Sequence, residues 1–130
     1  MRIILDTHVF LWFVSGDPRL PTRYRSEIQS PENDIFLSAA SIWEAVIKNQ
    51  LGHLPLPEKA SVYLPQQRLM HGIHSLPIDE NDMAALSNLP AHHRDPFDRM
   101  IIAQAVKHSL VLASLDSQFS AYPVALLPST

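Results

Sequence analysis

Two aspartates stand directly after apolar runs that have the length of buried strands. Asp6 follows the run 2–5, and Asp116 follows the run 110–113 after two further residues. If both runs are parallel strands of one sheet, the two carboxylates meet at its carboxyl edge, where α/β proteins place their ligand sites. Each aspartate could instead cap the helix that follows it, a common role for this residue type. Two acids at one edge favour a metal site over two separate caps.

Glu44 is an acid on an otherwise apolar helical line. Positions 40, 44, 47 and 51 lie on one face of a predicted helix, and all except Glu44 are apolar. A carboxylate on a core-facing line needs a partner, because burying an unpaired charge is costly. Ser41 and Glu44 have the spacing of a capping box, but the helix is predicted to begin near Ser38, which makes Glu44 an interior residue. We therefore favour a functional role for Glu44.

The segment Asp95-Pro96-Phe97-Asp98 opens another predicted helix with two acids in its first turn. Proline suits the first helical position, and capping together with the helix dipole accounts for Asp95 without any function. Asp98 shares a helical line with Ile102 and Ala105, which turns its carboxylate toward the buried side. Asp98 is therefore the stronger ligand candidate, and Asp95 is an accessory one.

A cluster of carboxylates requires a compensating cation. Two charges roughly 4 Å apart repel by about 4 kcal/mol at an effective dielectric constant near 20. Oxygen ligands in a chain without cysteine favour Mg²⁺ or Mn²⁺ over zinc, and such ions suit phosphodiester hydrolysis. We predict that Asp6, Asp98 and Asp116 are direct ligands. Glu44 either binds the ion through water or acts as a base toward the attacking water.

Short apolar runs alternate with amphipathic segments along the chain. We expect strands at 2–5, 34–37, 75–78 and 110–113, a fifth candidate at 124–127, and helices at 8–15, 21–30, 38–50, 58–71, 79–89 and 95–108. Thr7 and Asp79 are the predicted caps of the first and fifth helices, and a break or kink is expected at Pro65. This alternation predicts an α/β fold with a central parallel sheet of four to five strands and helices on both faces.

Length and composition fit one globular domain over residues 1–130. The chain has 130 residues, which leaves no room for a second core. Its formal net charge of −3 argues against general attraction for nucleic acid, and its three separated glycines exclude dinucleotide-binding and P-loop fingerprints. The longest uncharged stretch, 117–130, is too short for a bilayer span of about 20 residues, and Asp6 interrupts any signal peptide. A cytoplasmic location is therefore expected.

Two other groups of side chains have simple structural explanations. His71 and His74 have the spacing of a zinc half-site, but no cysteine or further histidine pair completes it. The run 10–13 is Phe-Leu-Trp-Phe in the first predicted helix, and four apolar residues in succession cannot all face the core. We expect most of this run to pack inside and some of it to face a partner.

Four short motifs, in this order, resemble those of PIN-domain proteins, and the match covers nearly the whole chain. They are Asp6-Thr7-His8 after a short strand, Ser38 with Ser41-Ile42-Trp43-Glu44, Arg94-Asp95-Pro96-Phe97-Asp98-Arg99 followed by Ala103-Gln104-Ala105, and Ser114-Leu115-Asp116. In particular the sequence resembles the single-domain VapC-like ribonuclease toxins of type II toxin–antitoxin modules. Ser114 is a departure, because the family more often has threonine there. Either hydroxyl can orient Asp116 or a metal-bound water.

The resemblance implies a PIN-like nuclease domain over residues 1–130. It implies that four acids hold Mg²⁺ or Mn²⁺ at the carboxyl edge of the sheet, a homodimer, an RNA substrate such as tRNA, and a small VapB-like antitoxin whose tail occupies the active-site groove. The expected catalytic residues are Asp6, Glu44, Asp98 and Asp116, the accessory ones are Asp95, Ser114 and Thr7, and the candidate RNA contacts are Arg94 and Arg99.

Two alternatives without catalysis fit the same fold class. A phosphoacceptor receiver-like domain has a similar length and an acidic pocket, but it needs a lysine at the end of a late strand. The only late lysine, Lys107, is predicted on a helix. A PIN-like fold kept only for binding would most simply have lost one of its acids. All four acidic positions are filled here.

Overall fold

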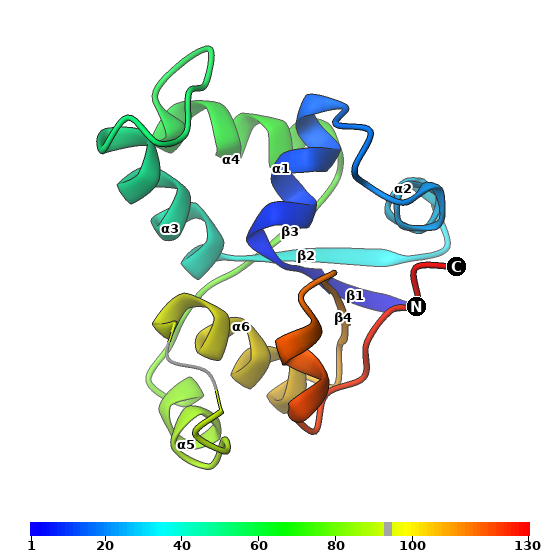
Figure 1. The fold of residues 1–130 in the computed structure, drawn as a ribbon, viewed down its shortest axis with the longest axis vertical. Helices are drawn as coiled ribbons and strands as arrows, with labels where there is room; N and C mark the ends of the chain where they lie inside the picture. The colour runs from blue at the N-terminus through cyan, green and yellow to red at the C-terminus, as the bar shows by residue number, and fades with distance from the viewer. Residues whose placement is uncertain (93–94) are drawn as a thin grey trace.

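A computed structural model describes residues 1–92 and 95–130 and has the predicted α/β architecture (Figure 1). The parallel strands lie in the order β3-β2-β1-β4, and they are β1 (Arg2–Leu5), β2 (Asp34–Ser38), β3 (His74–Leu76) and β4 (Val111–Ala113). In β1, Leu5 pairs with Leu37 of β2 on one side and with Ala113 of β4 on the other. The carboxyl ends of β1 and β4 therefore meet at one edge of the sheet.

Helices cover both faces of the sheet, as the alternation of elements predicts. On one face lie α1 (Thr7–Ser15), α2 (Thr22–Gln29), α3 (Ala39–Gln50) and α4 (Ala60–Met70), and on the other lie α5 (Asp82–Ser87), α6 (Pro96–Lys107) and the 3₁₀ helix η1 (Ser117–Ala121) (Figure 1). Within residues 1–92 and 95–130, none of the helices has the length and apolar character needed to cross a bilayer.

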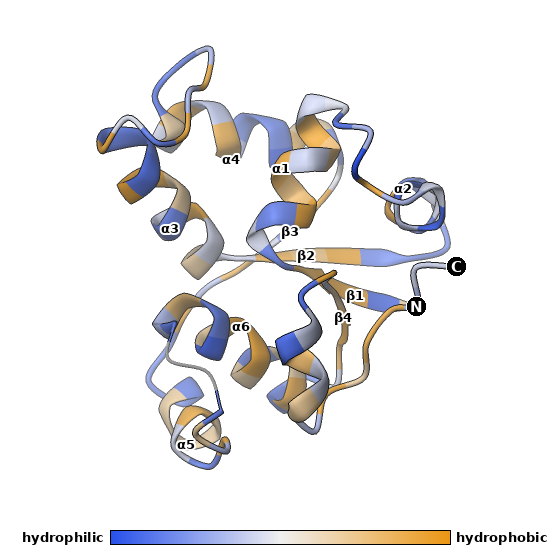
Figure 2. Cartoon of the chain, in the orientation of Figure 1, coloured by the Kyte–Doolittle hydropathy of each residue, from blue (hydrophilic) through white to orange (hydrophobic). Residues whose placement is uncertain are grey.

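The sheet separates two apolar clusters, because successive strand residues point to opposite faces. Ile3 and Leu5 pack with the cluster under α1, α2 and α4, whereas Ile4 packs with residues of α6 and η1. All three side chains are fully buried. The middle of the sheet is accordingly coloured as hydrophobic in Figure 2. β1 therefore contributes to both cores.

The sheet lacks the predicted fifth strand, and β3 ends earlier than predicted. Neighbouring prolines account for both differences. Residues 124–127 form a single parallel bridge between Leu112 and Leu126 instead of a fifth strand. Pro123 and Pro128 flank this segment, and proline cannot donate a ladder hydrogen bond. β3 ends at Leu76, before Pro77, instead of continuing to residue 78.

Three predicted details of the helices differ from the structure. Asp6, not Thr7, caps α1, because the Thr7 hydroxyl is directed into the interior. α5 begins at Asp82 instead of residue 79, since Asp79 Oδ1 accepts the N–H of Asn81 at 2.8 Å in a preceding turn. α4 continues through Pro65. This proline is the sixth of the eleven residues of α4, so the expected break does not occur although the missing N–H removes one helical hydrogen bond.

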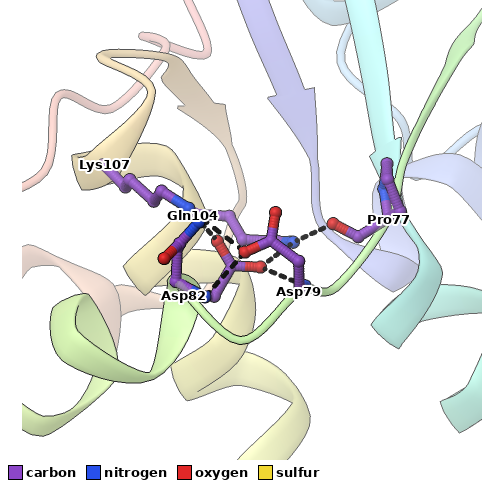
Figure 3. Close-up of polar contacts among 6 residues, drawn as sticks. Pro77, Asp79, Asp82, Gln104 and Lys107 are labelled. Carbon is purple, nitrogen blue, oxygen red and sulfur yellow. Dashed lines mark hydrogen bonds and ion pairs between the residues drawn. The ribbon is translucent and has the colours of Figure 1, made fainter.

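A buried polar network fixes α5 against α6 (Figure 3). Asp82 is 1% exposed, and its two oxygens accept from Lys107 Nζ at 2.9 Å, from Gln104 Nε2 at 3.2 Å and from the N–H of Asp79 at 3.0 Å. Gln104 Nε2 also donates to the carbonyl of Pro77 at 3.1 Å. The segment after β3 is thereby tied to the middle of α6.

Candidate active site

The junction of β1 and β4 fixes Asp6 at the carboxyl edge of the sheet. The N–H of Asp6 donates to the carbonyl of Ala113 at 3.1 Å, which extends the strand pairing by one residue. Asp6 is 6% exposed; its Oδ1 accepts the N–H of Val9 at 2.8 Å, and its Oδ2 accepts the hydroxyl of Ser114 at 2.5 Å. Capping therefore uses one oxygen of Asp6 and leaves the other facing β4. Burial raises the pKa of Asp6, although the hydrogen bonds from Ser114 and Val9 oppose the shift.

Glu44 is a buried and fully partnered acid in the interior of α3. Glu44 is 5% exposed. Its Oε1 accepts a hydrogen bond from the hydroxyl of Thr7 at 2.6 Å, and its Oε2 accepts one from Lys48 Nζ at 2.9 Å. Ser38 caps α3 by accepting the N–H of Ala40 at 3.0 Å, so the capping-box alternative for Glu44 is excluded. The need for a partner was predictable, and Lys48 stands at the i+4 position that pairs along a helix.

Ser41 was missed as part of this site. The hydroxyl oxygens of Thr7 and Ser41 lie 3.0 Å apart, and both residues are buried. Ser41 therefore helps to fix the hydroxyl that holds Glu44. The only sequence signal is its place three residues before Glu44, which a capping box would explain equally well.

Asp95 and Asp98 have the different roles that the helix pattern predicts. Asp95 caps α6, because its Oδ1 accepts the N–H of Phe97 at 2.8 Å and the N–H of Asp98 at 3.1 Å. Burial raises the pKa of Asp98 to about 7, and the negative charges of Asp95, Glu44, Asp6 and Asp116 add to the shift. Asp95, Glu44, Asp6 and Asp116 thus lie near enough to Asp98 for their charges to disfavour its ionised form.

Asp116 completes the group from the loop after β4. Its Oδ1 accepts the N–H of Gln118 at 2.9 Å, which caps η1, and its own N–H donates to the hydroxyl of Ser114 at 3.1 Å. Ser114 therefore bridges Asp6 and Asp116. A cleft of about 290 Å³ opens beside them and is lined by Asp6, His8, Val9, Trp12, Leu115 and Asp116.

The profile of the PIN domain matches residues 3–125. The chain belongs to the PIN domain family. This membership confirms the family predicted from the four motifs and excludes the receiver-like alternative. Within this PIN domain Asp6 directly follows β1, Glu44 lies in α3, Asp98 lies in the first turn of α6, and Asp116 lies in the loop after β4.

This PIN domain is similar to a named ribonuclease and to proteins with solved structures. Ribonuclease VapC16 of Mycobacterium tuberculosis is 42% identical over 55 residues, a segment that spans 42% of this chain and 39% of that protein. FitAcB from Neisseria gonorrhoeae has a TM-score of 0.66 at 27% identity, with 98% of this chain and 97% of that chain covered. VapBC2 from Rickettsia felis, bound to a promoter DNA fragment, has a TM-score of 0.72 at 13% identity over 98% of each chain, a likeness of fold alone.

The donor atoms of this PIN domain fit a hard divalent cation in their chemistry. The four predicted site acids offer only oxygen, and Mg²⁺ and Mn²⁺ prefer such ligands. In residues 1–92 and 95–130, however, no three His, Asp or Glu side chains form a ready-made ligand group. The raised pKa values of Asp6 and Asp98 favour the protonated form of each carboxyl group in the fold. A bound cation would instead stabilise the ionised carboxylates.

The sequence also suggests two candidate RNA contacts and a pair of histidines. Arg94 falls outside the described residues. The guanidinium of Arg99 donates to the carbonyl of Pro90 at 2.8 Å, which accounts for this side chain structurally, and its contact with RNA stays a prediction. His71 packs edge-on against Phe13, and His74 lies 3.7 Å from the carboxylate of Asp34. The two histidines thus have separate partners.

We expect the metal-free PIN domain to lose stability as the pH rises from about 5 to 8. The pKa of Asp98 is raised to about 7 from its ordinary value of 3.8, so the folded protein holds a proton there that the unfolded chain has released. The stabilisation from this proton is fully present below about pH 4 and is lost as the pH rises through about 7. Thermal melts in EDTA at several pH values measure the effect.

Asp98→Asn provides the control, because an amide does not ionise in this range. The variant should melt higher than the wild type at about pH 8, by roughly 1–2 kcal/mol after allowance for solvent screening, which corresponds to a few degrees. All other side chains are the same in the two proteins, so their effects cancel in the comparison. Parallel curves for the two proteins would show that Asp98 does not carry the pH dependence.

Proposed function

We propose that this protein is a metal-dependent endoribonuclease and the toxin component of a type II toxin–antitoxin module. The observation that carries the proposal is the position of Asp6 and Asp116 at one edge of the sheet, where the hydroxyl of Ser114 contacts both residues, and the charges of both add to the burial that raises the pKa of Asp98. Grouped carboxylates destabilise a fold, so their convergence is best explained by chemistry. The similarity to Ribonuclease VapC16 supports cleavage of RNA as that chemistry.

Asp6, Asp98 and Asp116 are the residues that would hold Mg²⁺ or Mn²⁺. When bound, such an ion lowers the pKa of water and offsets the charge of a phosphodiester. The site's negative charge otherwise repels phosphate, so the proposal requires a cation for substrate binding as well as for hydrolysis.

The surrounding side chains hold the acids in position. The Ser114 hydroxyl contacts both Asp6 and the backbone of Asp116, which fixes the spacing between the ends of β1 and β4. Thr7 and Lys48 each hold one oxygen of Glu44, so this carboxylate stays oriented while it accepts a proton from water or hydrogen-bonds to an ion-bound water.

The proposed partners are a structured RNA such as tRNA, a small VapB-like antitoxin and a second copy of this chain, in the cytoplasm. The solved structures with this fold support the assembly, because they include VapBC2 and FitAB bound to DNA fragments and a toxin–antitoxin complex from Klebsiella pneumoniae. VapC20 of Mycobacterium tuberculosis, which has the same fold, is a toxin that cleaves the sarcin–ricin loop.

The test of the proposed function is cleavage of RNA by the purified protein with and without divalent metal. We expect labelled RNA to be cut at internal positions in Mg²⁺ or Mn²⁺, cleavage to stop in EDTA, and activity to return when either metal is added in excess. Zinc should not replace them, because the described site contains neither cysteine nor a grouped set of histidines. Cleavage that persists after thorough chelation would rule out the metal-dependent mechanism.

A further inference from the structure

The cleft beside Asp6 and Asp116 has one acidic side and one aromatic, apolar side. His8, Val9 and Trp12 line it from α1, and Leu115 lines it from the loop after β4. Its volume of about 290 Å³ lies at the small end of the range for ligand pockets, so it suits one ring system and not a long chain segment. We call it the Trp12 cleft.

Trp12 contributes little to the core of the protein. In the run 10–13, Phe10 and Phe13 are buried, whereas Trp12 is only partly buried and packs at the margin of its apolar cluster. This confirms that the run does not face inward as a whole. A large aromatic side chain at the mouth of an acidic site is therefore available to a ligand.

The ring of Trp12 is held in place by its neighbours. The guanidinium of Arg19 lies 4.9 Å from the ring centroid, and Asp17 fixes that guanidinium through bonds of 2.7 to 3.2 Å. The imidazole of His8 lies 6.1 Å away, centroid to centroid, at a tilt of 57°. Because the ring is pre-ordered, a ligand that packs on it pays little entropy for ordering the protein.

We propose that the Trp12 cleft binds the nucleobase next to the phosphate that is cleaved. The inference rests on the proposed function, since it assumes that the phosphate lies at the acids. Asp6 and Asp116 line the cleft and are also proposed metal ligands, so a base in the cleft would lie next to a phosphate bound at these acids. Aromatic side chains bind bases of single strands through their π faces with little sequence preference.

Charge complementarity also favours a base over other parts of the substrate. Away from a bound cation, Asp6 and Asp116 would repel a second phosphate in the cleft, whereas a nucleobase is neutral. Its amino or ring N–H groups can donate to carboxylates, as they do when acidic side chains contact cytosine. Val9 and Leu115 form the apolar side of the cleft, which fits the flat, apolar face of a base.

The two tryptophans of the chain provide a matched pair of reporters. Trp43 lies on α3, is 59% exposed and packs edge-on against Phe97, outside the Trp12 cleft. Trp43→Phe leaves Trp12 as the single tryptophan, and Trp12→Phe leaves Trp43. Both proteins should carry Asp98→Asn, so that RNA binds without turnover.

We expect single-stranded tetranucleotides of A, C, G or U, added with Mg²⁺, to quench the fluorescence of Trp12 much more strongly than that of Trp43. This order is the reverse of the order expected from exposure, since Trp43 is the more exposed side chain. A response that follows exposure, or a silent Trp12 at saturating RNA, would overturn the inference and leave the cleft to a protein partner.

A second measurement localises the base. Trp12→Ala should weaken RNA binding by about 5- to 100-fold, the range expected for loss of one aromatic–base contact, and Trp12→Phe should retain most of the affinity. RNAs with one abasic residue should lose a similar factor at a single position, and there the Trp12→Ala effect should disappear. If Trp12→Ala weakens binding by the same factor wherever the abasic residue is placed, Trp12 does not contact a single base.

These binding measurements separate the cleft from the proposed function. If RNA quenches Trp12 but the wild type cleaves no RNA, the cleft stands and the nuclease proposal fails. If the wild type cleaves RNA while Trp12 does not respond, the nuclease proposal stands and the cleft inference fails.

Discussion

Replacing Asp98 by asparagine should lower the rate of RNA cleavage by roughly 10³-fold, because the proposed cation would lose a direct carboxylate ligand and with it several kcal/mol of transition-state stabilisation. The amide keeps the size of the side chain, and its neutrality removes both the cost of burying a charge and the repulsion from nearby acids, which together raise the pKa of Asp98 to about 7. The fold should therefore be preserved or stabilised while activity is lost. Cleavage of labelled RNA in saturating Mg²⁺ measures the rate, and thermal melts verify the fold.

Asp95→Asn is the matched control for this experiment. Asparagine caps helices as well as aspartate does, so the bonds to the N–H groups of Phe97 and Asp98 can persist. The change also removes the largest repulsive charge on Asp98 and should lower its pKa. We expect activity to fall by less than about tenfold and its pH profile to shift toward acid. Equal losses in the two variants would place Asp95 among the metal ligands.

The positions of the acids were predictable because local patterns fix them. Asp6 and Asp116 each follow a short apolar run, and Asp98 occupies the buried side of the first turn of α6. Parallel strands send their carboxyl ends to one edge, so the topology places Asp6 and Asp116 at the same edge of the sheet. Glu44 was recognisable because it interrupts an apolar helical line.

The partners of the acids were harder to predict, because they depend on tertiary contacts. Thr7 reads as a cap from the sequence, yet its hydroxyl bonds to Glu44, which is 37 positions away in the chain. Asp6 takes the cap instead, and Ser114, 108 positions away, holds its second oxygen. Local propensity ranks threonine and aspartate similarly as caps, so only the packing of α1 against α3 decides between them.

The same limit explains why Asp82 was missed. Asp79 stands at the start of the predicted helix and has the pattern of a cap. That pattern gives the acid three residues later no distinct role. Asp82 is instead the buried one, and its partners Gln104 and Lys107 come from α6. No local pattern announces a contact between elements separated by more than 20 positions.

Asp82→Asn should lower the free energy of unfolding by about 2–4 kcal/mol, which corresponds to roughly 10 °C in melting temperature. Both oxygens of Asp82 accept hydrogen bonds, from Lys107 on one and from Gln104 and the N–H of Asp79 on the other. An asparagine has only one acceptor oxygen, so its amide group must face a donor in a buried place. Chemical denaturation at neutral pH measures the loss.

Asp79→Asn makes the same chemical change three residues away and should cost less than about 1 kcal/mol. The Asp79 side chain is 58% exposed, and its carboxylate lies 3.5 Å from Lys107. Burial alone would raise the pKa of Asp82, but the hydrogen bonds from Asp79, Lys107 and Gln104 outweigh it and hold the pKa below 3.8. The stabilisation by Asp82 is therefore present above about pH 4 and is lost as the pH falls through the folded pKa. The difference between the wild type and Asp82→Asn should narrow in acid, and a difference that is constant down to about pH 2 would show that packing, not charge, holds α5 against α6.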